Sequence, residues 1–158
     1  LPFFPLVAWY AGSLRSGRFM TKKRAVKLPA QHDPALWNSY DLLSFPSCRE
    51  DGDDLIRHFL LTFLPGLINV AKGDLQIIGV APRSPDDISM LDDEWRQAYL
   101  RSKAGLITEA IINFGTNPSP FELYSAEMLY SKTFSRMGDL ILIGRYFRLV
   151  FSAYRKRG

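Results

Sequence analysis

Apolar residues recur at helical spacing through the middle of the chain. From residue 55 to residue 71 they fall three and four positions apart, which is the spacing of one helix face. Pro65 interrupts this run, so we expect the first helix to end or kink near Phe63 and a second helix to start at Leu64. Gly73 then ends the second helix.

Shorter patterns on either side favour strands and turns. Residues 28–45 read as loop and short strands, and residues 75–79 are β-prone. Two prolines make residues 82–85 a rigid turn. Residues 106–114 are apolar and rich in β-branched side chains, which predicts another strand.

Three further helices complete the pattern. Residues 92–103 open with acids and close with cations, which suits the helix dipole, and residues 121–134 follow a proline-rich loop. The last helix, residues 139–154, is apolar nearly all round, so we expect it to be buried in part or to lie on a membrane. The mixture predicts a helix-rich α+β fold.

Composition and charge narrow the class of protein. With 47% apolar and 23% charged residues the chain is not disordered. No run approaches the roughly 18 to 20 uninterrupted apolar residues of a spanning helix. The single Cys48 cannot form an internal disulfide, which favours a reducing compartment. No nucleic-acid-binding motif accompanies the net charge of +4, so we expect no nucleic-acid partner.

The two ends of the chain carry most of the basic residues. Eleven of the twenty Lys and Arg residues lie within residues 15–27 and 145–157, whereas the acids cluster in the middle. Residues 1–11 are apolar and include a Trp-Tyr pair. An aromatic, apolar segment followed by cations is typical of a membrane interface. The alternative is a buried N-terminal strand followed by a solvated charged loop.

We therefore predict a membrane-associated segment over residues 1–14 and a folded domain over residues 15–158. The segment would be the tail of a proline-broken re-entrant helix. The residues expected to contact lipid are Phe3, Phe4, Pro5, Trp9, Tyr10, Arg18, Lys22, Lys23 and Arg24.

One long motif is similar to a known family. The stretch Leu64–Gly79, LPGLINVAKGDLQIIG, followed by Pro82-Arg83-Ser84-Pro85, resembles the central signature of bacterial sugar transferases of the monotopic polyprenyl-phosphate phosphoglycosyl transferase family. Leu-Pro, Asn-Val and Lys-Gly-Asp occur at that family's spacing. Weaker matches cover nearly the whole chain, at Phe4-Pro5, Lys103, Gly105, Ala110, Tyr130, Ser135, Asp139 and Leu140.

The resemblance implies a monotopic enzyme at the cytoplasmic face of the bacterial inner membrane. Such an enzyme transfers a phosphosugar from a nucleotide sugar to undecaprenyl phosphate during exopolysaccharide or glycoconjugate synthesis. In the family, an Asp-Glu pair directly before Leu-Pro does the chemistry. The aspartate forms a covalent phosphosugar intermediate, and the glutamate helps to place Mg²⁺.

This chain departs from the family at those two positions. They hold Thr62 and Phe63, of which the first is a weak nucleophile without a base and the second cannot bind a hard cation. His58, one helical turn before Thr62, is the nearest candidate base. A basic segment of the family is replaced by residues 40–45, YDLLSF. We therefore predict a pseudoenzyme that is a structural or interaction subunit of a membrane protein complex.

Three cations remain as candidates for binding phosphate. Arg83 matches the family's arginine, and its alternative role is to pair with Asp86 or Asp87. Lys72 and Lys103 are otherwise helix-end cations. We expect membrane lipid and a membrane-protein partner or larger complex, with no cofactor and no metal site. A nucleotide sugar and Mg²⁺ belong to the alternative, an active phosphoglycosyl transferase.

Overall fold

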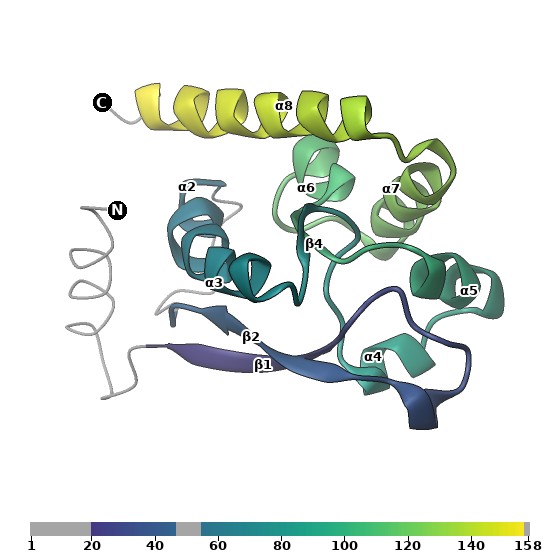
Figure 1. Ribbon diagram of the computed structural model, residues 1–158. Helices are drawn as coiled ribbons and strands as arrows, with labels where there is room; N and C mark the ends of the chain where they lie inside the picture. The colour runs from purple at the N-terminus through teal and green to yellow at the C-terminus, as the bar shows by residue number, and fades with distance from the viewer. Residues whose placement is uncertain (1–19, 47–54, 157–158) are drawn as a thin grey trace.

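The computed structural model describes residues 20–46 and 55–156, in a helix-rich α+β arrangement (Figure 1). Strands β1 (Thr21–Val26) and β2 (Ser39–Ser44) form an antiparallel ribbon in which Thr21 pairs with Ser44 and Val26 with Ser39. A second sheet joins β3 (Gln76–Ile78) and β4 (Gly105–Ile107) in parallel. In Figure 1 the ribbon runs along the bottom and the last helix along the top.

The central helical run bends where the sequence predicts. It consists of α2 (Leu55–His58), a π-helical turn η2 (Phe59–Phe63) and α3 (Leu64–Lys72). Pro65 has no N–H, so the carbonyl of Leu61 cannot receive the usual bond from the residue four positions later. Instead it accepts the backbone N–H of Phe45, just beyond β2, at 2.7 Å. Gly73 ends α3 in a left-handed conformation with φ of 76°.

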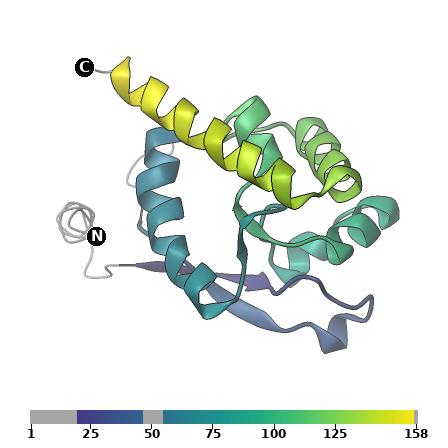
Figure 2. The ribbon, with the colours of Figure 1, turned by 45° about the horizontal axis from the view of Figure 1, so that its top comes forward.

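Six further helical segments complete the described chain. Besides the short η1 (Pro34–Leu36), they are α4 (Pro85–Ser89), α5 (Asp93–Arg101), α6 (Glu109–Phe114), α7 (Pro120–Thr133) and α8 (Arg136–Arg155). Figure 2 shows α8 running across α2 and α6, both of which it contacts. The expected helices over residues 92–103, 121–134 and 139–154 are confirmed.

Three expectations differ from the structure. The strand expected over residues 106–114 ends at Ile107, because Thr108 caps a helix by accepting the N–H of Ile111 at 3.1 Å. Ser84 likewise caps α4, where the sequence indicated only a rigid turn. The cations at positions 22–24 lie on β1, so they are not part of a solvated loop.

One core joins the two sheets to the helices. Val26, Ile78, Ile88, Tyr99, Ile107 and Tyr146 are among its buried members. By length and composition Leu55–Lys72 is the one run in the described residues that could cross a membrane, although it has no long uninterrupted apolar stretch. Its buried Phe63, Gly66 and Asn69 face other parts of the fold, whereas most of its other residues are only half-buried.

Two glycines allow β3 and β4 to approach closely. A Cβ added to Gly79 would collide with the backbone oxygen of Lys103, and one added to Gly105 would collide with the backbone nitrogen of Gly79. Backbone atoms cannot move aside as a flexible side chain can. Both positions therefore require glycine for reasons of space.

We expect Gly105→Ala to lower the free energy of unfolding by about 2 kcal/mol or more, because the added methyl group forces the strands apart. Gly144→Ala is the control, since Gly144 lies in α8 with open space around it. That variant should gain about 1 kcal/mol from helix propensity. Urea denaturation measures both, and equal stabilities for the two variants would contradict the packing argument.

Candidate functional site

Phe63 lies inside a cluster of aromatic rings. Its side chain is 4% exposed, and its ring centroid lies 5.4 Å from that of Phe59, 5.6 Å from Tyr146 and 5.9 Å from Phe147. We call these four residues the aromatic cluster. Two come from η2 and two from α8, so the cluster attaches the central helical run to the last helix. At this position the chain uses its side chain for packing.

His58 adjoins the aromatic cluster. Its Nδ1 lies 2.9 Å from the hydroxyl of Tyr146, with the two rings edge to face. Burial lowers the pKa of His58 from 6.5 to about 4, so the imidazole is neutral at pH 7. A base with so low a pKa has little driving force to take a proton from a threonine hydroxyl. The partly buried Thr62 therefore has a poor base in His58.

The family-like Asn and Asp of the long motif connect α3 to β2. Asn69 is 1% exposed, and its amide accepts the N–H of Leu43 at 3.0 Å and donates to the carbonyl of Asp41 at 2.8 Å. The same amide donates to the carboxylate of Asp74 at 3.2 Å. Asp74 is thus a turn residue that satisfies a buried amide. This part of the motif positions the β1–β2 ribbon.

Arg83 and Glu127 form a buried ion pair. Nη1 of Arg83 lies 2.9 Å from both carboxylate oxygens, and the two side chains are 10% and 3% exposed. The guanidinium also lies over the rings of Trp95 and Tyr99, at 5.1 and 4.7 Å from their centroids. Arg83 therefore pairs with Glu127 and not with either nearby aspartate.

Glu127 gathers several parts of the chain around the ion pair. It accepts the indole N–H of Trp95 at 2.7 Å and the backbone N–H of Ala81 at 3.2 Å. Tyr99 donates to the carbonyl of Ala81 at 2.8 Å, and burial raises its pKa. We call Arg83, Glu127, Trp95 and Tyr99 the arginine hub. Sequence reasoning missed Glu127, since no motif or spacing marks one glutamate on α7.

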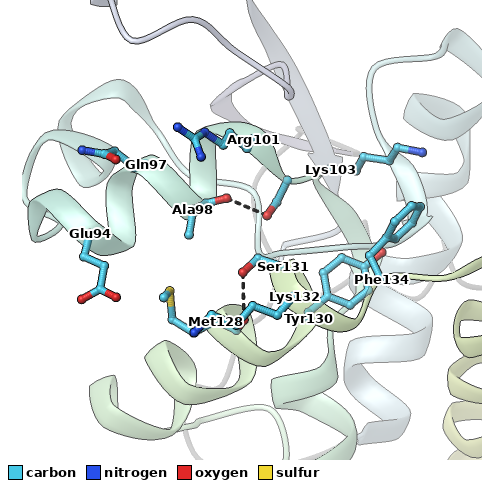
Figure 3. Close-up of a pocket in the computed structure, with 11 residues that line it drawn as sticks. Glu94, Gln97, Ala98, Arg101, Lys103, Met128, Tyr130, Ser131, Lys132 and Phe134 are labelled. Atoms are coloured by element: carbon cyan, nitrogen blue, oxygen red, sulfur yellow. Dashed lines mark hydrogen bonds between the residues drawn. The ribbon is translucent and has the colours of Figure 1, made fainter.

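A pocket of about 440 Å³ lies between α5 and the end of α7 (Figure 3). Its lining residues are Glu94, Gln97, Ala98, Arg101, Ser102, Lys103, Met128, Tyr130, Ser131, Lys132 and Phe134. Of the three predicted phosphate-binding residues only Lys103 is among them. Arg83 is in the arginine hub, and Lys72 is exposed at the end of α3. The structure does not bring the three together in this pocket.

The residues at the expected metal position do not fit Mg²⁺. Phe63 has no oxygen to offer, and Mg²⁺ needs oxygen ligands. Within residues 20–46 and 55–156 no group of three or more His, Cys, Asp or Glu side chains is placed to hold a metal ion.

The predicted lipid contacts fall largely outside the described residues, which begin at residue 20. This applies to Phe3, Phe4, Pro5, Trp9, Tyr10 and Arg18, and to the boundary between residues 14 and 15. Lys22, Lys23 and Arg24 are exposed on β1. Lys22 lies 3.7 Å from the carboxylate of Asp41 on β2. Because this ion pair is exposed to solvent, it contributes little to the stability of the fold.

We expect Glu127→Gln to lower the free energy of unfolding by about 3 kcal/mol or more, because it leaves the charge of Arg83 buried without a partner. Glu122→Gln, on the same helix, is the matched control. Glu122 accepts the N–H of Ser119 in a capping box, which glutamine also satisfies. Urea denaturation compares them, and a Glu127→Gln variant as stable as the control would show that the pair is dispensable.

Stability should also depend on pH through His58. The unfolded chain takes up a proton below about pH 6.5, whereas the folded chain resists it down to about pH 4. Lowering the pH through this window therefore favours unfolding, by at most about 1.4 kcal/mol per pH unit. His58→Gln should lose less stability over the window than the parent chain. Urea denaturation at several pH values measures both profiles, and identical profiles for His58→Gln and the parent chain would refute the role of His58.

Comparison with known protein families finds a match to the sequence that spans these residues. The model of a family described as bacterial sugar transferase matches residues 50–153, which include η2, the arginine hub and the pocket. No curated protein matches the chain significantly. Because the match covers most of the sequence, the chain belongs to the bacterial sugar transferase family.

Proposed function

We propose that this sugar transferase domain functions without the family's phosphosugar transfer, as a structural or interaction subunit of a membrane protein complex at the cytoplasmic face of the bacterial inner membrane. The observation that carries the proposal is the packing of Phe63. Where the resemblance calls for a carboxylate, this chain places a ring in contact with three other rings. A carboxylate there would be costly to bury.

The buried contacts of Arg83 support the same proposal. Its charge is compensated by Glu127, and its guanidinium lies over two aromatic rings. A phosphate would have to compete with a carboxylate that already accepts four hydrogen bonds. In this chain the arginine of the motif contributes to the architecture of the domain.

Association with the membrane or a membrane partner is supported by α8. Its exposed apolar residues Met137, Leu140, Ile141 and Phe151 follow one helix face, and exposed Arg148 and Arg155 lie along it. An exposed apolar face with cations suits an anionic membrane surface or the rim of a membrane protein. Together with exposed Lys22, Lys23 and Arg24, it supports the proposed location.

The proposal is tested by an assay of nucleotide release. The full chain is incubated with UDP-sugars, Mg²⁺ and undecaprenyl phosphate, beside a family member that has the Asp-Glu pair. We expect release of UMP by the control enzyme and none above background by this chain. Release that disappears in Thr62→Ala would overturn the proposal and establish an active transferase with a threonine nucleophile.

The same preparation tests the role as a subunit. Extracted from native membranes in mild detergent, the chain should migrate in an assembly well above its own mass of 18.0 kDa. Migration as a lone chain, together with the absence of activity, would refute the proposed subunit. Replacing Leu140 and Ile141 with serine should release the partner if α8 makes the contact, whereas Met90→Ser, at another exposed site, should not.

A further inference from the structure

The pocket between α5 and α7 is separate from the aromatic cluster and the arginine hub, since none of their residues lines it. At about 440 Å³ its size is within the range of small-molecule sites in proteins. One wall comes from α5 and the residues after it, and the facing wall from the last two turns of α7 and Phe134 (Figure 3). Most of the lining residues belong to α5 and α7, so the pocket is built into the fold.

The floor of the pocket is largely apolar and its hydroxyls are satisfied. Ala98, Met128 and the buried ring of Tyr130 supply apolar surface. Ser102 donates to the carbonyl of Ala98 at 2.8 Å, and Ser131 donates to that of Met128 at 2.8 Å. Tyr130 donates to Asp139 at 3.2 Å. The floor therefore suits the neutral part of a ligand.

The rim of the pocket is positively charged. Arg101 and Lys103 come from one wall and Lys132 from the other, against a single acid, Glu94. Among the described residues none of the three cations is within ion-pair distance of a carboxylate, and Nζ of Lys103 lies 4.7 Å from the centroid of the Phe134 ring. The lining has a net formal charge of +2 at neutral pH. Such a rim matches a dianion.

We propose that this pocket binds a small phosphomonoester. Its phosphate, which carries close to two negative charges at pH 7, is held by Lys103 and Lys132. Its organic part lies against Ala98, Met128 and Phe134. Long lysine side chains can swing over the opening to reach the phosphate. The site goes beyond the proposed subunit function and does not depend on it, because no residue at the transferase position takes part.

Calorimetric titration of the full chain in neutral detergent tests the site with three probes. Adenosine monophosphate represents nucleotides and glucose 6-phosphate represents sugar phosphates, the two kinds of phosphomonoester tested. Inorganic phosphate represents the anion alone. We expect saturable binding of at least one monoester, weaker binding of inorganic phosphate, and none of adenosine or glucose. Equal affinity for all three phosphates would overturn the assignment of an organic part, and the absence of saturable binding would overturn the site.

Four variants then locate the binding. Lys103→Gln and Lys132→Gln should each weaken binding of the monoester about tenfold, as expected for the loss of one charged hydrogen bond. Glu94→Gln removes the one acid of the lining and should tighten binding. Arg96→Gln is the control, because Arg96 is on α5 and pairs with Asp93 outside the pocket lining. Circular dichroism confirms that each variant is folded. Binding that all four variants leave unchanged would show that the ligand sits elsewhere.

Discussion

The buried pair of Arg83 and Glu127 is the interaction on which the arrangement of the domain depends. Two charges taken out of water are tolerable only when their remaining hydrogen-bonding groups are satisfied. Here Trp95 from α5 and the backbone of Ala81 satisfy Glu127, and two rings cover the guanidinium. The carbonyl of Arg83 also accepts the N–H of Val26 at 2.9 Å. The ion pair thereby connects the end of β1, the segment after β3, α5 and α7, and fixes their relative positions.

The aromatic cluster and the arginine hub show how this chain uses the side chains in and beside the long motif. The long motif is kept where it serves packing, as in Asn69, Gly73 and Asp74, which connect α3 to β2 and end the helix. At Thr62 and Phe63 it differs, and the ring of Phe63 fills a place in the core. In this chain the central helical run and α8 meet there through apolar ring contacts.

The sequence predicted the longer helices α3, α5, α7 and α8 well, because their spacing, caps and prolines are local signals. It identified the break at Pro65 and the ends of α3, α5 and α7 within a few residues. It did not predict α6, since its apolar, β-branched sequence favours a strand and only the cap at Thr108 starts a helix. Glu127 was missed for a different reason. Its role arises from three segments distant in sequence, and such a meeting leaves no local pattern. Of the three cations that line the pocket, the sequence identified Lys103 as a candidate but gave no signal for Arg101 or Lys132.

The bend at Pro65 also ties two elements together energetically. The carbonyl of Leu61, freed by the missing N–H of the proline, is satisfied by Phe45, which directly follows the β1–β2 ribbon. Neither element completes its backbone hydrogen bonding alone: the helix needs the ribbon docked, and the end of the ribbon needs the bent helix. The proline that would break an isolated helix therefore leaves a carbonyl through which the ribbon, which lies ahead of the family-matched residues, is hydrogen-bonded to them.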